Sequence, residues 1–348
     1  MAYTDIDKPS DYFSTKLYTG TGSSHAVSGI GFQPDWCWIK CRDDSHNHQV
    51  FDSVRGVHKR MRTDTNGAET SSTESLKSFD STGFTLGTQA NVNNPSNTFA
   101  SWNWKAGTSV SGTTTGSGTG KAYSGSVSTD AGFSIIGYVG NGTAGHEIPH
   151  HLNSVPKMMI IKNRDNTQGW ATYHHTEGAG KFLDLSDDNS SQSGTSIFNN
   201  TTPTSSVFSV ATSGWTNDNG YNYIAYCFAE KKGFSKAFSY NGNGSSDGSY
   251  IHLGFRSSFI MIKRVDSGSN AGWLMFDNKR LGYNGGNSFL EAHNSATESS
   301  AERIDILSSG FKNRSTTQVN NASGGSYIGI AFAESPFTTS TGIPTTAR

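Results

Sequence analysis

The clearest pattern along the chain is a nearly continuous apolar run that ends in lysine and occurs three times. The runs cover residues 36–40, 158–162 and 259–263. Such a run, short and without apolar/polar alternation, is typical of a central β-strand that is buried on both faces. Three runs of this kind predict three sheets, each with a buried centre.

The apolar runs belong to a longer repeated unit. Each run follows a Tyr-x-Gly-x-Gly segment that begins at Tyr18, Tyr138 or Tyr240. The opening tyrosines lie 120 and 102 residues apart, and the lysines that end the runs lie 122 and 101 residues apart. Because independent landmarks keep nearly the same spacing, the repetition is not a coincidence. A unit of about 95 residues has the size of a free-standing sandwich domain.

Short β-branched and aromatic runs alternate with Gly, Asn and Ser clusters, which predicts about seven strands per unit. We therefore predict an all-β fold with three tandem β-sandwich domains of jelly-roll or lectin-like type. The predicted parts are an N-terminal segment (1–9), repeat 1 (10–106), a Gly/Ser/Thr linker (107–130), repeat 2 (131–230), repeat 3 (233–334) and a C-terminal tail (335–348).

Three further predictions concern the linker, the helices and the tail. The linker shows no hydrophobic period, so we expect it to be flexible. Helices are expected only as single short pieces at 72–79 and 296–307. The tail is expected to run extended along a surface.

Composition and charge narrow the classes of partner. The chain has 27 basic and 28 acidic side chains and a formal charge of −1, so it lacks the basic field that nucleic-acid binding requires. No apolar run approaches 18 residues, and residues 1–10 do not have the pattern of a signal peptide. We therefore expect no nucleic-acid partner, no membrane insertion and synthesis in a cytoplasm.

The three cysteines, Cys37, Cys41 and Cys227, are expected to be buried and unreactive. On a strand, Cys37 and Cys41 would lie about 13 Å apart, which is beyond the reach of a disulfide.

One segment matches a catalytic motif. Residues 146–150 read His-Glu-Ile-Pro-His, the H-E-x-x-H signature of zinc peptidases, which requires both histidines on one face of a helix. Pro149 would break that helix, and the repeat places the segment opposite strand-like sequences. We interpret it as a strand with exposed histidines. No recurrent carboxylate pair is present. The prediction is therefore no enzyme, no catalytic residue, no metal and no cofactor.

Two recurring polar features could bind a ligand. The Lys-x-Arg-Asp turns at 40–43 and 162–165 either hold a ligand or blunt a strand end. The Asn-rich turns either hold sugar hydroxyls or are structural turns, since Asn and Asp tolerate left-handed backbone conformations. The ligand-binding candidates in and beside these turns are Asn91, Asn93, Trp215, Asn217, Asp218, Asn219, Tyr221, Asn320 and Asn321.

Several strings of the repeat resemble a domain of unknown function that recurs in virion and tail-associated proteins of marine tailed phages, including cyanophages. These strings lie at 31–40, 51–56, 81–87, 102–106, 224–230 and 276–280, and the ending 342–348 looks typical of the same group. The resemblance covers nearly the whole chain and implies a component of the phage particle. It carries no catalytic residues.

Together these observations lead to an expected function. The chain is predicted to be a structural or adhesive virion protein, a tail fibre or similar appendage, that binds host-surface polysaccharide or neighbouring virion proteins. The alternatives are a purely structural capsid-decorating or tail protein without a host ligand and, third, a polysaccharide depolymerase. We expect a homo-oligomer, a trimer first, although three repeats in one chain could already form a pseudo-threefold body.

Overall fold

The computed structural model describes residues 3–268, 271–280 and 283–345. Strands dominate it, so the all-β prediction is confirmed. The helical elements of the described residues are the 3-10 helix η1 (Pro9–Asp11) and three single turns, α1 (Ala90–Asn93), α2 (Thr195–Phe198) and α3 (Gln318–Asn321). None of the helices in these ranges is long and apolar enough to cross a membrane.

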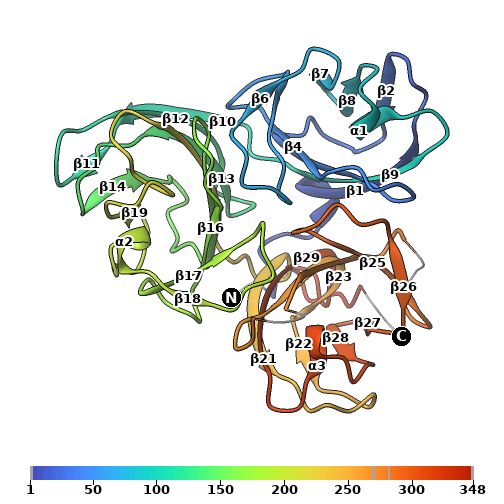
Figure 1. The fold of residues 1–348 in the computed structure, drawn as a ribbon. Helices are drawn as coiled ribbons and strands as arrows, with labels where there is room; N and C mark the ends of the chain where they lie inside the picture. The colour runs from blue at the N-terminus through green and yellow to red at the C-terminus, as the bar shows by residue number, and fades with distance from the viewer. Residues whose placement is uncertain (1–2, 269–270, 281–282, 346–348) are drawn as a thin grey trace.

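Figure 1 shows three lobes arranged around a common centre. We call residues 13–104 lobe 1, residues 108–228 lobe 2 and residues 235–336 lobe 3. The strands of lobe 1 are β1 (Phe13–Thr19), β2 (His25–Ser28), β3 (Trp36–Cys41), β4 (Gln49–Asp52), β5 (Lys59–Arg60), β6 (Thr70–Ser71), β7 (Leu76–Asp80), β8 (Gly83–Leu86) and β9 (Thr98–Trp104).

The other two lobes contain the remaining strands. Those of lobe 2 are β10 (Thr108–Thr113), β11 (Thr115–Gly116), β12 (Ala122–Ser128), β13 (Phe133–Val139), β14 (His146–Pro149), β15 (Met158–Asn163), β16 (Trp170–His174), β17 (Lys181–Asp184), β18 (Gln192–Ser193), β19 (Val207–Val210) and β20 (Asn222–Phe228). Those of lobe 3 are β21 (Ser235–Asn241), β22 (Tyr250–His252), β23 (Phe255–Arg264), β24 (Trp273–Asp277), β25 (Asn287–Glu291), β26 (Ser299–Ala301), β27 (Ile304–Leu307), β28 (Gly310–Asn313) and β29 (Ser326–Pro336).

The same strand order occurs in all three lobes. The large sheets contain β1-β9-β3-β4, β13-β20-β15-β16 and β21-β29-β23-β24, and all the pairs are antiparallel. A smaller sheet accompanies each, with the orders β2-β8-β7, β11-β14-β19 and β22-β28-β27. In each large sheet the central strand is the apolar run that the sequence singled out.

The apolar run at the centre of each large sheet is buried on both faces, for a different reason on each side. In lobe 1, Cys37 and Ile39 pack with residues of the small sheet, whereas Trp36 and Trp38 belong to a cluster shared with the other lobes. Every residue of β3 is therefore buried, as predicted for a central strand. The three cysteines are free thiols, and their predicted burial is confirmed.

Three equivalent aromatic side chains meet at the centre. Trp104, Phe228 and Phe332 lie near the ends of the closing strands β9, β20 and β29. Their ring centroids lie 6.5 Å (Trp104–Phe228), 5.6 Å (Trp104–Phe332) and 5.8 Å (Phe228–Phe332) apart. Aromatic burial of this kind supplies much of the apolar area that holds the lobes together.

A loop from each lobe packs on the next lobe, which closes a ring. The loops are 61–69 of lobe 1 on lobe 2, 184–191 of lobe 2 on lobe 3, and 291–298 of lobe 3 on lobe 1. One backbone hydrogen bond recurs at each contact: Glu69 N to Arg164 O (2.8 Å), Ser191 N to Val265 O (2.9 Å) and Glu298 N to Arg42 O (2.7 Å). We call these contacts seam 1–2, seam 2–3 and seam 3–1.

Residues 107–130 are not the flexible linker that the sequence predicted. They form β10, β11 and β12, and β12 pairs along its length with β13, the first strand of the repeated order in lobe 2. The tract lacks a hydrophobic period because β10 is exposed, and only Tyr123 and Val127 of the tract join the core of lobe 2. A solvent-exposed hairpin satisfies its backbone groups by pairing and needs few apolar side chains.

The expected helices and the extended tail are also wrong. Residues 76–80 form β7, and the stretch 296–307 contains β26 and β27, because these polar segments lie at the edges of sheets. The tail folds back on itself through a bridge between Thr338 and Pro344. Its Ser340 donates its backbone N–H and its hydroxyl to Asp7, so the two terminal segments lie together.

Candidate functional site

The Asn-rich turn of lobe 2 is held by the buried side chain of Asn217. Its Oδ1 accepts a hydrogen bond from Asn141 N at 2.9 Å, and its Nδ2 donates to Ala211 O at 2.5 Å and to Thr143 O at 2.9 Å. These contacts tie the Tyr-x-Gly-x-Gly segment to the turn between β19 and β20. We call this arrangement the asparagine staple.

Asn93 and Asn321 make the same contacts in the other two lobes. Asn93 accepts from Thr21 N (2.8 Å) and donates to Gly87 O and Ser23 O, and Asn321 accepts from Asn243 N (3.0 Å) and donates to Ser315 O and Ser245 O. The opening tyrosines complete the staple. Each tyrosine hydroxyl donates to the backbone carbonyl of the residue that precedes the staple asparagine, in the pairs Tyr18–Val92, Tyr138–Thr216 and Tyr240–Asn320.

The staple has a steric requirement that explains the first glycine of the repeated segment. A Cβ at Gly20, Gly140 or Gly242 would lie 2.1–2.3 Å from a carbonyl oxygen of the Asn-rich turn. No side chain fits there, so only glycine lets the two segments approach.

The staple corrects four predicted ligand-binding residues. Asn93, Asn217 and Asn321 are fully buried and bonded within their own lobes. Asn320 is buried too, and its amide bonds to Ser315, Thr317, Arg303 and Asn313. A buried amide with all its groups paired cannot reach a sugar, so these four are structural.

The other five candidates do not converge on one site. Asn219 and Tyr221 are exposed on one loop of lobe 2, with half-buried Asp218 beside them. Trp215, also half-buried, packs edge-on against Phe182 at 5.2 Å. Asn91 lies in lobe 1. The predicted ligand-binding residues that remain as candidates therefore form one short loop of lobe 2 and an isolated asparagine in lobe 1.

The His-Glu-Ile-Pro-His segment forms strand β14, as expected, but its histidines are buried rather than exposed. His146 Nδ1 lies 2.9 Å from Asn217 Oδ1, and His146 Nε2 lies 2.6 Å from Thr114 Oγ1. His150 Nε2 lies 3.1 Å from Thr204 O, and burial lowers the pKa of His150 to about 4. In the ranges that the structure describes, no group of three or more His, Cys, Asp or Glu side chains is placed to hold a metal ion.

The lysines that end the apolar runs are fully buried beside the seams. Lys162 Nζ donates to Gln168 O at 2.6 Å and reaches Asn66 O of lobe 1 at 3.1 Å, and Lys263 Nζ reaches Asp187 O of lobe 2 at 3.4 Å. Lys40 donates to Cys41 O at 2.7 Å. Burial lowers the pKa of each of these lysines to about 8.

Two seams contain a buried chain of alternating charges. In seam 1–2, Arg55 bonds Asp52 (2.5 Å) and Glu69 (3.2 Å), and Glu69 also accepts from Arg164 of lobe 2 (3.0 Å). In seam 3–1 the chain runs from Asp277 through Arg280 (2.7 Å) and Glu298 (3.1 Å) to Arg42 (2.8 Å). Arg42 and Arg164 of the Lys-x-Arg-Asp turns are therefore inter-lobe contacts, whereas Asp43 and Asp165 of the same turns are exposed.

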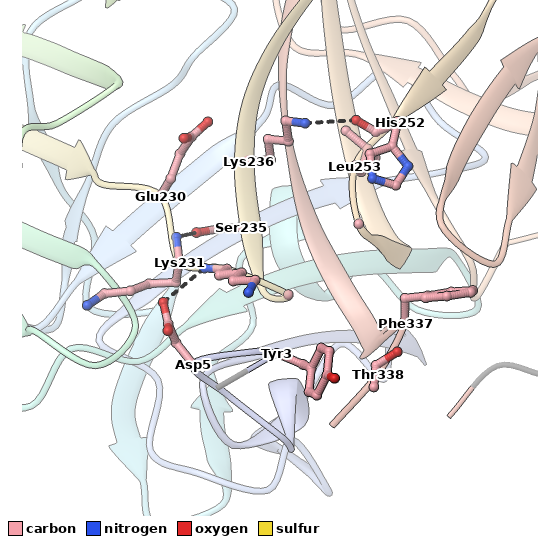
Figure 2. A pocket seen from close by; sticks show the side chains of 13 residues that line it. Tyr3, Asp5, Glu230, Lys231, Ser235, Lys236, His252, Leu253, Phe337 and Thr338 are labelled. Carbon is pink, nitrogen blue, oxygen red and sulfur yellow. Dashed lines mark hydrogen bonds between the residues drawn. The ribbon is translucent and has the colours of Figure 1, made fainter. Parts of the chain in front are cut away.

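A large groove lies where the chain ends meet lobe 3. It has a volume of about 630 Å³ and is bordered by the N-terminal segment, the connector 231–233, β21, β22 and the tail. Figure 2 shows the rings of Tyr3, Phe337 and His252 around it. Lys236 Nζ donates to His252 O at 2.9 Å, while the Asp5 carboxylate accepts from Lys232 N at 3.0 Å. No sequence pattern indicated this groove, because its walls come from segments that are distant in the chain.

Residues 8–336 match DUF7483, a family described as a domain of unknown function. The chain belongs to this family. No curated protein and no solved structure matches it.

Some of the features described above lie inside the residues that match DUF7483, and others lie partly outside them. The staples and the three seams lie inside the matched range, and the match covers all three lobes. Tyr3, Asp5, Phe337 and Thr338 of the groove lie outside that range. The groove is thus built partly by DUF7483 residues and partly by the flanking segments of this chain.

Proposed function

We propose that this protein is a non-enzymatic structural and adhesive component of a tailed-phage particle. In this proposal its three lobes are diverged copies of one β-sandwich domain. The observation that carries the proposal is the closed ring, in which one chain reproduces the arrangement of a cyclic trimer. The resemblance of the repeat to phage virion proteins is the reason for assigning the chain to a phage particle.

The seams support a rigid body rather than three loosely tethered modules. Seams 1–2 and 3–1 contain buried ion chains, and all three lobes contribute aromatic side chains to one core. A body of this kind presents its outer loops in a fixed geometry, which suits attachment to a repeated surface such as host polysaccharide or neighbouring virion proteins.

The particle assignment is tested by location. Particles of a phage that encodes this chain would be labelled with an antibody fragment against an exposed loop, such as 219–221 of lobe 2, and imaged. We expect label on the particle, at an appendage if the role is adhesive and on the capsid lattice if it is decorative. Absence of the chain from purified particles by mass spectrometry would refute the proposal.

The oligomeric state is tested by sedimentation of the purified chain. We propose that one chain forms its own pseudo-threefold body, so a monomer is expected at micromolar concentration. A stable homotrimer would show instead that the outer surfaces carry a further interface.

A further inference from the structure

Large exposed apolar side chains gather around lobe 3 and the chain ends. Six such side chains stand out among the described residues, and four of them lie there: Tyr3 (62% exposed), Tyr250 (47%), Phe337 (45%) and Ile343 (63%). Single exposed apolar residues need no explanation, but a group with three aromatic rings on one part of a surface points to a binding site.

Two grooves lie beside each other at this surface, separated by strand β22. The 630 Å³ groove is lined by His252, Tyr3 and Phe337 (Figure 2), and a second groove of about 500 Å³ is lined by Tyr250, Arg256 and Tyr283. Tyr250 and His252 are two residues apart on β22 and both are exposed. The Tyr250 hydroxyl lies 3.2 Å from His252 Nδ1, so the grooves adjoin.

The rings of Tyr250 and Tyr283 are held in place by polar contacts. The Tyr250 hydroxyl lies 2.7 Å from Ser309 Oγ, and the Arg256 guanidinium stacks over the Tyr283 ring at 5.2 Å. Fixed rings next to hydroxyl, imidazole and guanidinium groups can stack on the face of a sugar and bond its hydroxyls.

The charge of the grooves favours an acidic ligand. Lys236 donates to a carbonyl, and in the described part of the chain no carboxylate lies within salt-bridge distance of it. Asp5 is bonded to the backbone N–H of Lys232, and Glu230 to that of Ala237. Arg256 has one carboxylate nearby, Glu334 at 3.9 Å. A carboxylated sugar would complete the bonding of these cations.

We propose that the two adjoining grooves of lobe 3 form one extended binding site for an acidic saccharide. Tyr3, Phe337 and Tyr250 stack on successive sugar rings, and Lys236 pairs with a sugar carboxylate. This inference rests on the proposed function and specifies where the particle protein would bind a host polysaccharide.

The test is titration of the whole purified chain with two size-matched probes, a hexameric polyuronate and an uncharged gluco-hexamer. We expect the polyuronate to bind and Tyr250→Ala, or Tyr3→Ala with Phe337→Ala, to weaken binding about tenfold or more. Lys236→Gln should weaken the polyuronate alone. Tyr250→Phe should retain most of the affinity, because the ring face remains.

Tyr221→Ala is the matched control, because Tyr221 is an exposed tyrosine (38%) on the predicted loop of lobe 2. It should leave binding unchanged. All altered side chains except Lys236 are exposed, and thermal melting checks that each variant is folded. No binding of either probe, equal binding of both, or a loss with Tyr221→Ala alone would overturn the inference.

Failure here is distinguishable from failure of the proposed function. A chain that is located on the particle but binds neither probe loses the saccharide site only. A chain that binds polyuronate through lobe 3 but is absent from particles loses the particle role only.

Discussion

Seam 2–3 joins its lobes with different chemistry from seam 1–2. In seam 1–2 the last residue of β4, Asp52, starts a buried ion chain and accepts the Tyr226 hydroxyl of lobe 2 at 2.7 Å. In seam 2–3 the equivalent last residue of β16 is His174, whose Nε2 lies 3.3 Å from Gly329 O of lobe 3. Ser191 and Val265 stand where seam 1–2 has Glu69 and Arg164.

The comparison separates what closes the ring from what reinforces it. The backbone hydrogen bond between the loop and the next lobe is present in every seam. In the part of the chain that the structure describes, the ion chain is present in seams 1–2 and 3–1. Ring closure therefore depends on the shape of the lobes and on the backbone hydrogen bond between them. A buried ion chain is one of two ways in which side chains fill the space around that hydrogen bond.

The largest effect is expected from breaking an ion chain. Arg280→Met leaves Asp277 and Glu298 buried without their shared cation, which should lower the free energy of unfolding by about 3–5 kcal/mol. Chemical denaturation measures it. Glu177→Met changes the equivalent position of lobe 2, where the carboxylate pairs with half-exposed Lys181, and should cost at most about 1 kcal/mol. Equal losses for the two variants would contradict the difference between the seams.

Variants of the asparagine staple should lower the stability of the protein by similar amounts in the three lobes. Asn93→Ala, Asn217→Ala and Asn321→Ala each remove three buried hydrogen bonds and leave backbone groups unpaired. Each should cost about 1–3 kcal/mol, with similar values in the three lobes. Thermal or chemical denaturation of the three single variants decides it. A large loss in one lobe with none in the others would mean that the staple is not a shared device.

Mild acid should weaken seam 2–3 before seam 1–2. Burial, with the neighbouring His175 charge, lowers the pKa of His174 to about 3. The unfolded chain therefore binds more protons than the folded chain below about pH 6.5, and stability is lost as pH falls from 6.5. His175, whose pKa is also lowered, mainly by burial, acts in the same direction.

Seam 1–2 should resist acid longer, because the pKa of its Glu69 is lowered. Burial raises the pKa of Glu69, but bonds from Arg164 and Arg55 outweigh burial and hold the pKa below its ordinary value near 4.5. Its contribution is present above pH 4.5 and is lost only below. On going from pH 7 to pH 5, the protection of Ser191 N against hydrogen exchange, corrected for the intrinsic rate at each pH, should therefore fall more than that of Glu69 N. An equal fall in protection at both amides would refute this order.

The smallest effect is expected from adding an ion pair to seam 2–3. The double variant Ser191→Glu with Val265→Arg places side chains like those of Glu69 and Arg164 at the equivalent positions. The Arg164 side chain is only partly buried, so the gain should be about 0–1 kcal/mol. A gain of several kcal/mol would mean that seam 2–3 is limited by its missing charges.

The sequence predicted the parts of the fold that repeat, and missed the parts that depend on how the lobes meet. The apolar run with its terminal lysine located every central strand. Nothing in the run showed that one face of Trp36–Cys41 would meet other lobes, because burial against a neighbour and burial inside a sandwich look alike in sequence.

The ligand-binding predictions for Asn93, Asn217, Asn320 and Asn321 failed for a related reason. An asparagine in an exposed turn and one that staples two turns have the same local sequence, so Asn217 could not be assigned before its partners at 141, 143 and 211 were placed. The recurrence of Tyr-x-Gly-x-Gly with an Asn about 75 residues later was the available signal. The groove at Tyr3 and Phe337 gave none, since its walls are more than 330 residues apart in the chain.

Covalent continuity gives this ring a freedom that a trimer of identical subunits lacks. In a homotrimer every substitution appears three times, so a charge lost from one seam is lost from all, and a new groove arises in triplicate. Here lobe 2 has exchanged the ion chain for His174 and added the hairpin β10–β12, while lobe 3 alone borders the groove at the chain ends. The three positions around the axis of each ring are therefore not equivalent. An assembly of such chains would have one binding site for each chain rather than one for each lobe.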